Sequence, residues 1–363
     1  AGRSACPMEA KVKRTVPALM CLLIGVTLAF VACSREAPAP KEMAAPYSPP
    51  ALDGYEAMKI PADNAMTAAK VELGRQLYYD TRLSGDGTLA CYSCHVEEKG
   101  LTDGRPTAIG AYGVKINRAA PTMWNIGYHA EWYWDGRAKT LEGQAKAAWA
   151  GGNMGATGKD GKPSTDGICA KLNQIDGYRS QFQAVFGGAC TPDNVSKALA
   201  AFMRTIVAND SAWAHFRMGH TSGFSEQAQR GYEIFKGKAR CENCHAGLLL
   251  TDLQYHNTGI GMKAKEPDLG RYRVTNEERD KGAFKTPTLL DISKSAPYFH
   301  DGSVATLEAA LDLMLAGGIE NTWLDRANLR PPIKLTKQER EDLLAFLRAL
   351  DANYTISEPR LPQ

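Results

Sequence analysis

The sequence predicts a mainly α-helical protein built from two homologous domains, residues 60–215 and 216–363. Three observations carry this prediction. Apolar side chains recur at helical spacing in segments separated by Gly- and Pro-rich loops, and no alternating apolar run indicates a substantial sheet. The same motifs also occur twice in the same order. With 363 residues, 44% of them hydrophobic, the chain is long enough to form two cores.

The N-terminal region is expected to lie outside both domains. A basic segment precedes an uncharged stretch, 16–32, that ends in small residues, as a secretory signal does. Small residues before Cys33 are typical of lipoprotein processing, so residues 1–33 are interpreted as a signal and lipoprotein region. A simple cleaved signal and an uncleaved anchor are the alternatives. Residues 34–59, rich in Pro and Ala, predict a spacer, and the expected location is the periplasm, with lipid at Cys33 as the membrane anchor.

The net charge and the cysteines bear on possible partners and on a possible disulfide. The formal net charge is +3, and no stripe of interleaved basic and aromatic residues occurs, so a nucleic-acid partner is excluded. Cys169 and Cys190 belong neither to the N-terminal region nor to a repeated motif. In an oxidising compartment they would close a loop of about 20 residues, with a stabilisation on the order of 3 kcal/mol. Two buried free thiols are the alternative.

The helical segments can be placed in order along the chain. Thr336 followed by Glu339 fits a capping box, which fixes the start of the last helix. The expected helices cover residues 68–79, 141–150, 194–207, 225–236, 307–315 and 337–350.

The repeat is defined by motifs that follow these segments. Fourteen residues separate Pro121 from Asp135, and fourteen separate Pro287 from Asp301. Each Asp is followed by Gly and then by a Thr-Leu-Glu sequence. Matching order and spacing of this kind indicate homologous domains.

Each copy contains one Cys-X-X-Cys-His motif. Two cysteines three residues apart present their sulfurs to the two vinyl groups of a haem, and the adjacent histidine reaches the iron. A zinc site or a redox dithiol is the alternative. The motifs predict two covalently attached haem c groups, with His95 and His245 as proximal iron ligands. The predicted attachment residues are Cys91, Cys94, Cys241 and Cys244.

The residues expected opposite the two irons differ. Met314 stands thirteen residues beyond Asp301 on an apolar helical segment, and the matching position beyond Asp135 is Ala148. A thioether opposite histidine raises the potential and suits electron transfer, whereas alanine cannot bind iron. Core packing is the alternative role for Met314. Trp134 lies in an aromatic loop between the two motifs and is either an electron relay or a packing residue.

These residues resemble the bacterial di-haem cytochrome c peroxidase family over the whole body of the chain. The resemblance implies that an N-terminal haem reduces hydrogen peroxide. It also implies that a C-terminal, higher-potential haem receives electrons from a c-type cytochrome or a cupredoxin. It makes Met314 the distal ligand of the second haem, Trp134 the inter-haem tryptophan and Gln144 a peroxide-pocket residue. Homodimers are common in this family. The matching segments are Lys70–Arg75, Tyr79–Ser84, Trp134–Arg137, Tyr255–Gly259 and Ala296–Gly302.

One departure from the family concerns the first haem. Many members cap it with a loop histidine, and the matching position here is Ala111. The first haem is therefore expected to be open, unless His129 or Met154 binds the iron. This is similar to the family branch that matures methylamine dehydrogenase, although that branch has tyrosine in place of Met314.

Two further departures concern protons and calcium. The family usually supplies a proton-relaying glutamate where this chain has Asn153, and Gln144 cannot replace it. Either another carboxylate such as Glu131 or Glu142 enters the pocket, or peroxidase turnover is slow and a different oxidation is favoured. Calcium often lies between the family's domains. The resemblance assigns Ser295 and Pro297 as its ligands, while Ala119 replaces an asparagine in that site.

The favoured function is therefore a c-type di-haem peroxidase. The first alternative is a maturation enzyme that uses peroxide to oxidise tryptophan or another aromatic residue of a partner protein, with surface aromatics such as Trp132 carrying the oxidising equivalents outward. The second alternative is an electron carrier, which has little use for an open haem.

Overall fold

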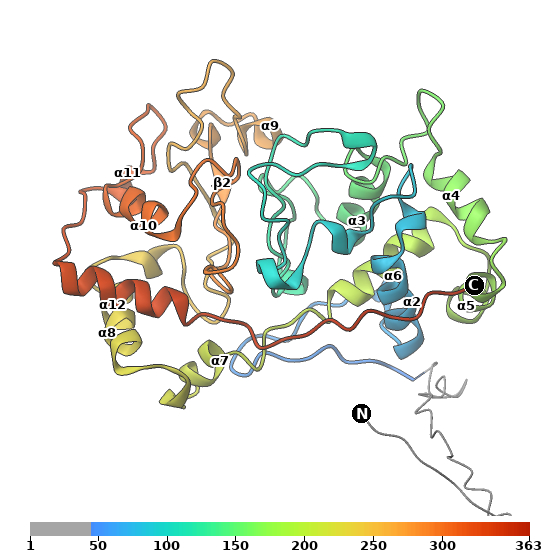
Figure 1. The fold of residues 1–363 in the computed structure, drawn as a ribbon, viewed down its shortest axis with the longest axis horizontal. Coiled ribbons are helices and arrows are strands. Elements are labelled where there is room, and N and C mark those ends of the chain that lie inside the picture. Colours follow the sequence, from blue (N-terminus) through green and yellow to red (C-terminus); the bar gives the residue numbers. More distant parts are fainter. Residues whose placement is uncertain (1–44) are drawn as a thin grey trace, which may run out of the picture. The chain divides into compact units, whose positions relative to one another are not determined.

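Two crossed pairs of helices form the framework of the computed structural model, which describes residues 45–363 (Figure 1). In the first half, α2 (Ala68–Tyr79) packs against α6 (Pro192–Met203). In the second half, α8 (Glu226–Lys236) packs against α12 (Lys337–Arg348). The prediction of a mainly helical fold is confirmed.

Both pairs cross at a glycine. A Cβ atom on Gly74 would lie 1.9 Å from the carbonyl oxygen of Ala198, and one on Gly231 would lie 2.0 Å from that of Asp342. Only glycine allows backbones to approach this closely. The two halves therefore use the same packing device, in agreement with the repeat in the sequence.

The remaining elements are short and are joined by long loops. The described residues form one two-stranded sheet, in which β1 (Tyr255–His256) pairs antiparallel with β2 (Phe284–Lys285). Tyr255 lies opposite Lys285. The other helices are α3 (Leu141–Ala150), α4 (Thr165–Leu172), α5 (Asp176–Phe186), α7 (Ala212–Arg217), α9 (Tyr272–Thr275), α10 (Leu307–Leu315) and α11 (Arg326–Leu329).

Most predicted helix ends are confirmed, including the capping box of Thr336 and Glu339. The helix predicted over 194–207 instead begins at Pro192, because the Thr191 side chain caps it. It ends at Met203 because the chain beyond it is held by Asn125, whose side chain accepts a hydrogen bond from the N–H of Ala208 at 2.9 Å. The helices α4, α5, α7, α9 and α11 were not predicted.

The predicted spacer is partly packed on the body. Leu52 is buried in a cluster with Val207 and Leu249, and its N–H donates to the Tyr128 hydroxyl at 3.1 Å. Residues 45–59 therefore lie on the body rather than forming a free spacer. The signal region 1–33, with Cys33, and residues 34–44 lie outside the described residues. In the part that the structure describes, no helix has the length and apolar character needed to cross a membrane.

The C-terminal segment joins the two halves. After α12 it runs back across the first half toward α2 and α5 (Figure 1). The carbonyl of Ile356 accepts a hydrogen bond from the Tyr79 hydroxyl at 3.1 Å, and that of Pro362 accepts one from Arg82 at 3.0 Å. The domain boundary near residue 216 stays a prediction.

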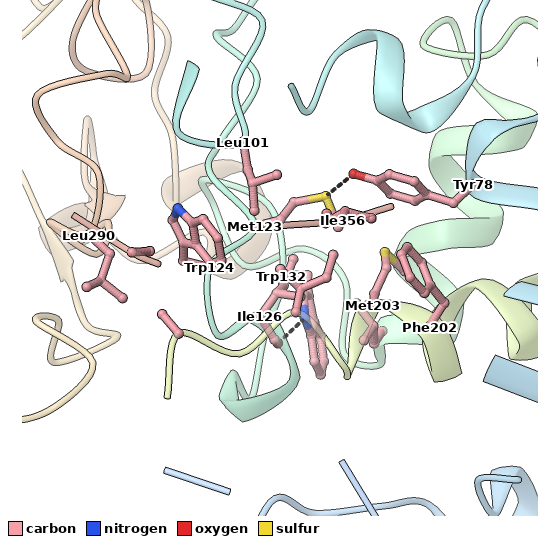
Figure 2. Close-up of a cluster of buried hydrophobic side chains, with 14 of the residues drawn as sticks. Tyr78, Leu101, Met123, Trp124, Ile126, Trp132, Phe202, Met203, Leu290 and Ile356 are labelled. Carbon is pink, nitrogen blue, oxygen red and sulfur yellow. Dashed lines mark hydrogen bonds between the residues drawn. The ribbon is translucent and has the colours of Figure 1, made fainter. Parts of the chain in front are cut away.

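The core is continuous between the halves. Figure 2 shows Tyr78, Met123 and Trp132 gathered in one buried cluster. The indole N–H of Trp124 donates to Asp291 of the second half at 2.9 Å. Elsewhere in this core the sulfur atoms of Cys169 and Cys190, both buried, lie 2.9 Å apart. Their disulfide stays a prediction.

Candidate haem sites

The first Cys-X-X-Cys-His motif lies at the wall of a cavity of about 710 Å³. Cys91, Cys94 and His95 all line it. The Nδ1 atom of His95 lies 3.0 Å from the carbonyl oxygen of Leu101, which sets the tautomer and leaves Nε2 free for a metal. Burial lowers the pKa of His95, so the imidazole stays neutral, as an iron ligand must.

The second motif repeats this arrangement at a smaller cavity of about 220 Å³, lined by Cys241, Cys244 and His245. The Nδ1 atom of His245 lies 3.0 Å from the carbonyl oxygen of Leu250. Burial lowers the pKa of His245 as well.

The two carbonyl acceptors are presented by an unusual backbone conformation. Leu101 has φ 59° and Leu250 has φ 51°, in the left-handed region that non-glycine residues rarely adopt. Such conformations cost on the order of 1 kcal/mol or more each, and they persist where the surroundings require them. The proximal side of each cavity therefore has the donor set and the fixed histidine that a haem c needs.

The residues singled out by comparing the two repeats line different cavities. Met314, on α10, lines the second cavity together with His245. Ala148, on α3, lines the first cavity, as does Gln144 one turn earlier. The structure thus brings each of these predicted residues to its expected cavity.

Trp134 lines both cavities. Its indole N–H donates to the carbonyl oxygen of Ala119 at 2.9 Å, and its own carbonyl accepts from the N–H of Lys285 at 2.8 Å. One bond is made to the first half and one to the second. Its neighbour Trp132 lines only the first cavity and is 7% exposed. The expectation that Trp132 is a surface aromatic is therefore wrong, because its indole is buried against the carbonyl of Ile126.

The loop that carries Ala111 is held away from the first cavity. Ala111 is buried but does not line the cavity, and its N–H donates to the carbonyl oxygen of Asn153 at 3.0 Å. His129 and Met154, the alternative ligands, do line it. Two further methionines, Met123 and Met203, also line it and were not considered from the sequence.

Neither carboxylate expected to relay protons lines the first cavity. Glu142 pairs with Arg204 at 2.7 Å, and Glu131 pairs with Arg271 at 2.8 Å. Burial alone would raise the pKa of each carboxyl, but hydrogen bonds lower both, that of Glu131 to about 2. This expectation is corrected: both side chains are held as anions by cations outside the cavity.

The cavity instead receives two carboxylates from the second half, Glu266 and Asp268. Asp268 pairs with Arg118 at 2.6 Å. No sequence signal linked this segment to the first motif, about 170 residues away, because only the tertiary structure brings them together.

His129 is a further polar group of the first cavity. Its Nε2 is buried and has no hydrogen-bond partner among the described residues. Burial, followed by the nearby charge of Lys285, lowers the pKa of His129 well below its usual value. A buried imidazole without a partner is costly unless a bound group or a proton uses it.

The described residues contain one group of three metal-binding side chains, Cys244, Asp252 and His256. Cys244 belongs to the second haem motif, and His256 is held between Asp252 at 2.9 Å and Asp325 at 2.5 Å. These contacts explain the group without an additional ion. Calcium at Ser295 and Pro297 stays a prediction.

Comparisons with known proteins agree with this geometry. The family model of the di-haem cytochrome c peroxidases matches residues 68–222. Cytochrome-c peroxidase IdrP1 of Denitromonas iodatirespirans is 34% identical over 346 residues, covering 86% of this chain and 90% of that protein. The methylamine utilization protein MauG of Methylorubrum extorquens is 36% identical over 313 residues, covering 85% of each chain.

A solved structure extends the similarity to the fold. A MauG-like protein associated with microbial copper homeostasis matches with a TM-score of 0.74 and 33% identity, over 90% of this chain and 98% of that one. Sequence and fold thus agree over most of both chains. This chain belongs to the di-haem cytochrome c peroxidase family and is an enzyme of the haem peroxidase class.

Proposed function

We propose that the protein reduces hydrogen peroxide in the first cavity with electrons that arrive through the second. The observation that carries this proposal is the position of Trp134, which lines both cavities, while Met314 lines only the second. In this assignment His95 and His245 are the proximal iron ligands. The haems are attached through Cys91 and Cys94 in the first half and through Cys241 and Cys244 in the second.

A haem supplies one-electron chemistry and, where its distal side is open, binds peroxide. With a haem in the first cavity, Ala148 would offer the iron no ligand, and the Gln144 amide would orient peroxide by hydrogen bonding. In the second cavity Met314 would offer the iron a thioether, which would exclude peroxide and suit that haem to electron transfer. Trp134 connects the two cavities.

Proton handling falls to groups that the sequence did not single out for it. Reduction of one peroxide to two waters consumes two protons and two electrons. Burial lowers the pKa of His129, so its ring stays neutral, with one nitrogen that donates a hydrogen bond and one that accepts, and it can pass a proton along such bonds, which the Gln144 amide cannot do. Glu266 places an exposed carboxylate at the same cavity.

The electron donor in this proposal is a small c-type cytochrome or a cupredoxin. The protein would act in the periplasm, held to a membrane by lipid at Cys33, with calcium at Ser295 and Pro297 and as a homodimer. Of these assignments, only the electron donor is needed for the chemistry in the first cavity.

A second candidate function is peroxide-dependent oxidation of an aromatic residue in a partner protein. It is favoured by two residues, Ala111 and Asn153, which replace the capping histidine and the proton-relaying glutamate of typical peroxidases. A simple electron carrier is disfavoured, because the first cavity is larger than the second and has alanine at the position that matches Met314.

One experiment separates these functions. Peroxide is added to the diferric protein, and its absorption spectrum is followed with and without ferrocytochrome c. Immediate reaction without prior reduction, followed by oxidation of the cytochrome, is the expected result. Mass gain on a neighbouring exported protein without oxidation of any small donor would instead support the second function. Two six-coordinate low-spin haems in the diferric state would refute the open first site.

A further inference from the structure

Three tyrosines form a continuous path from the first cavity to the surface. Tyr78 is completely buried and lines the cavity. Its ring centroid lies 5.7 Å from that of Tyr79, edge to face. The Tyr79 ring is stacked on that of Tyr92, with centroids 4.5 Å apart and an interplanar angle of 25°. Tyr92 is partly exposed and stands between the two cysteines of the first haem motif.

We propose that these tyrosines are a second electron path into the first cavity, which ends at Tyr92 and is independent of Trp134. The inference rests on the proposed reduction of peroxide in that cavity. When no electron comes through Trp134, peroxide that has reacted in the first cavity leaves an oxidising equivalent there, and Tyr78 supplies one electron to it. Tyr79 then reduces Tyr78, and Tyr92 reduces Tyr79. Tyr92 gives up its proton to water and is left as a neutral tyrosyl radical.

The hydrogen bonds of the inner tyrosines offer no base for their protons, so oxidation of Tyr78 or Tyr79 gives only a short-lived radical cation that the next tyrosine reduces. The Tyr78 hydroxyl donates to the sulfur of Met123 at 3.4 Å (Figure 2), and a thioether is a weak acceptor and a poor base. The Tyr79 hydroxyl donates to the carbonyl of Ile356 at 3.1 Å, which also cannot take a proton. Tyr92, being partly exposed, can release its proton to water. The lasting oxidation is therefore expected at Tyr92.

The charges around Tyr92 favour this end point. Burial raises the pKa of Tyr92, and the carboxylates of Glu98, Glu97 and Glu358 raise it further. The negative potential that these carboxylates create also lowers the free energy needed to remove an electron from the ring.

The positions in the second half that match these three tyrosines hold no tyrosine. The residues between Cys241 and Cys244 are Glu242 and Asn243, and the helix before them ends in Phe235 and Lys236. Neither glutamate nor asparagine can be oxidised by one electron under these conditions. The tyrosine path is therefore a property of the first cavity alone.

The test is to locate the oxidised tyrosine. The diferric holoprotein is treated with peroxide and the spin trap DMPO in the absence of an electron donor, and the adducts are mapped by peptide mass spectrometry. Peroxide consumption is measured in the same samples. We expect Tyr92 to carry most of the tyrosine adduct, and the adduct at Tyr92 to fall several-fold in Tyr79→Phe, which keeps the ring packing. Tyr55→Phe is the matched control, because Tyr55 is 41% exposed and lines neither cavity.

Exposure provides the competing explanation. If peroxide in solution attacked tyrosines directly, Tyr55 and Tyr112, the latter 43% exposed, would be labelled at least as strongly as Tyr92. That pattern, or an unchanged Tyr92 adduct in Tyr79→Phe, would overturn the path while leaving the proposed function intact. Absence of peroxide consumption by the wild-type holoprotein would overturn both. Should Tyr79→Phe not fold, Tyr92→Phe gives the same test, since the total adduct should fall rather than move to Tyr55.

Discussion

The two cavities have the same Cys-X-X-Cys-His motif in their walls, but they differ in volume and in the other residues that line them. Each has a Cys-X-X-Cys-His motif and a histidine fixed by the carbonyl of a left-handed leucine. The first cavity is about 710 Å³ with Ala148 in its lining, and the second is about 220 Å³ with Met314 at the matching position. In the proposed function, this difference separates a site that admits peroxide from one that passes electrons.

The most direct way to remove this difference is to place a methionine in the first cavity at the position that matches Met314. In Ala148→Met, a thioether should close the first iron, and peroxide consumption should fall on the order of 100-fold, equivalent to about 2.7 kcal/mol in the barrier. Peroxide consumption with ferrocytochrome c and the high-spin absorption bands measure the effect.

The control for this variant is Ala147→Met, which places the same side chain on an exposed position of α3. It should retain both the activity and the spectrum. Full activity in Ala148→Met would show that position 148 does not control access to the first iron.

The reverse change should open the second cavity. Met314→Ala removes the thioether, so the potential of the second haem should fall by a substantial part of the roughly 0.8 V range that axial ligands span. Turnover with ferrocytochrome c should drop about tenfold, or about 1.4 kcal/mol. Potentiometric titration measures the first effect, and Met218→Ala, at a position 43% exposed, is the control. An unchanged potential would mean that Met314 only packs.

Trp134 is the aromatic residue that lines both cavities, and its replacement tests whether electrons pass between them through its ring. Trp134→Phe should slow electron transfer from the second haem to the peroxide-oxidised first cavity severalfold, because phenylalanine is harder to oxidise and smaller. Stopped-flow spectroscopy of the prereduced protein measures this rate. Trp132→Phe, in the same loop but at the first cavity only, should transfer electrons at nearly the wild-type rate. Equal effects of the two changes would count against a special role for Trp134.

The smallest effect is expected for Glu131, whose carboxylate contacts the second half of the chain. Glu131 of the first half accepts a hydrogen bond from the Tyr255 hydroxyl of the second at 2.6 Å. Burial alone would raise the pKa of Glu131, but Lys139, Tyr255 and Arg271 lower it to about 2 from its ordinary 4.5. Glu131→Gln should cost about 1 kcal/mol of unfolding free energy at neutral pH.

The pH dependence gives the sign of this effect. A carboxyl whose pKa is lower in the folded than in the unfolded protein stabilises above about pH 4.5 and loses that stabilisation as the pH falls toward 2. The melting temperatures of wild type and Glu131→Gln should therefore converge on acidification. A difference that stays constant with pH would show that the ion pair contributes nothing.

The sequence by itself determined the proximal side of each site and the asymmetry between the sites. Two cysteines and a histidine act within one turn of chain, so their spacing is sufficient to predict their chemistry. Comparison of the two repeats then assigned Met314 and Ala148 to matching positions, because homologous segments fold alike. Each residue lies thirteen positions beyond the repeated Asp, Asp301 or Asp135.

Tertiary structure decided which distant side chains complete each cavity. Glu131 and Glu142 are near the predicted pocket in sequence, yet cations hold them outside it. Glu266 enters the first cavity from the other half of the chain. The burial of Trp132 and the stacking of Tyr79 on Tyr92 were equally hidden. The physical reason is the same in each case. These contacts form between segments that are far apart in the sequence, and the spacing of residues within one segment does not determine how two remote segments pack.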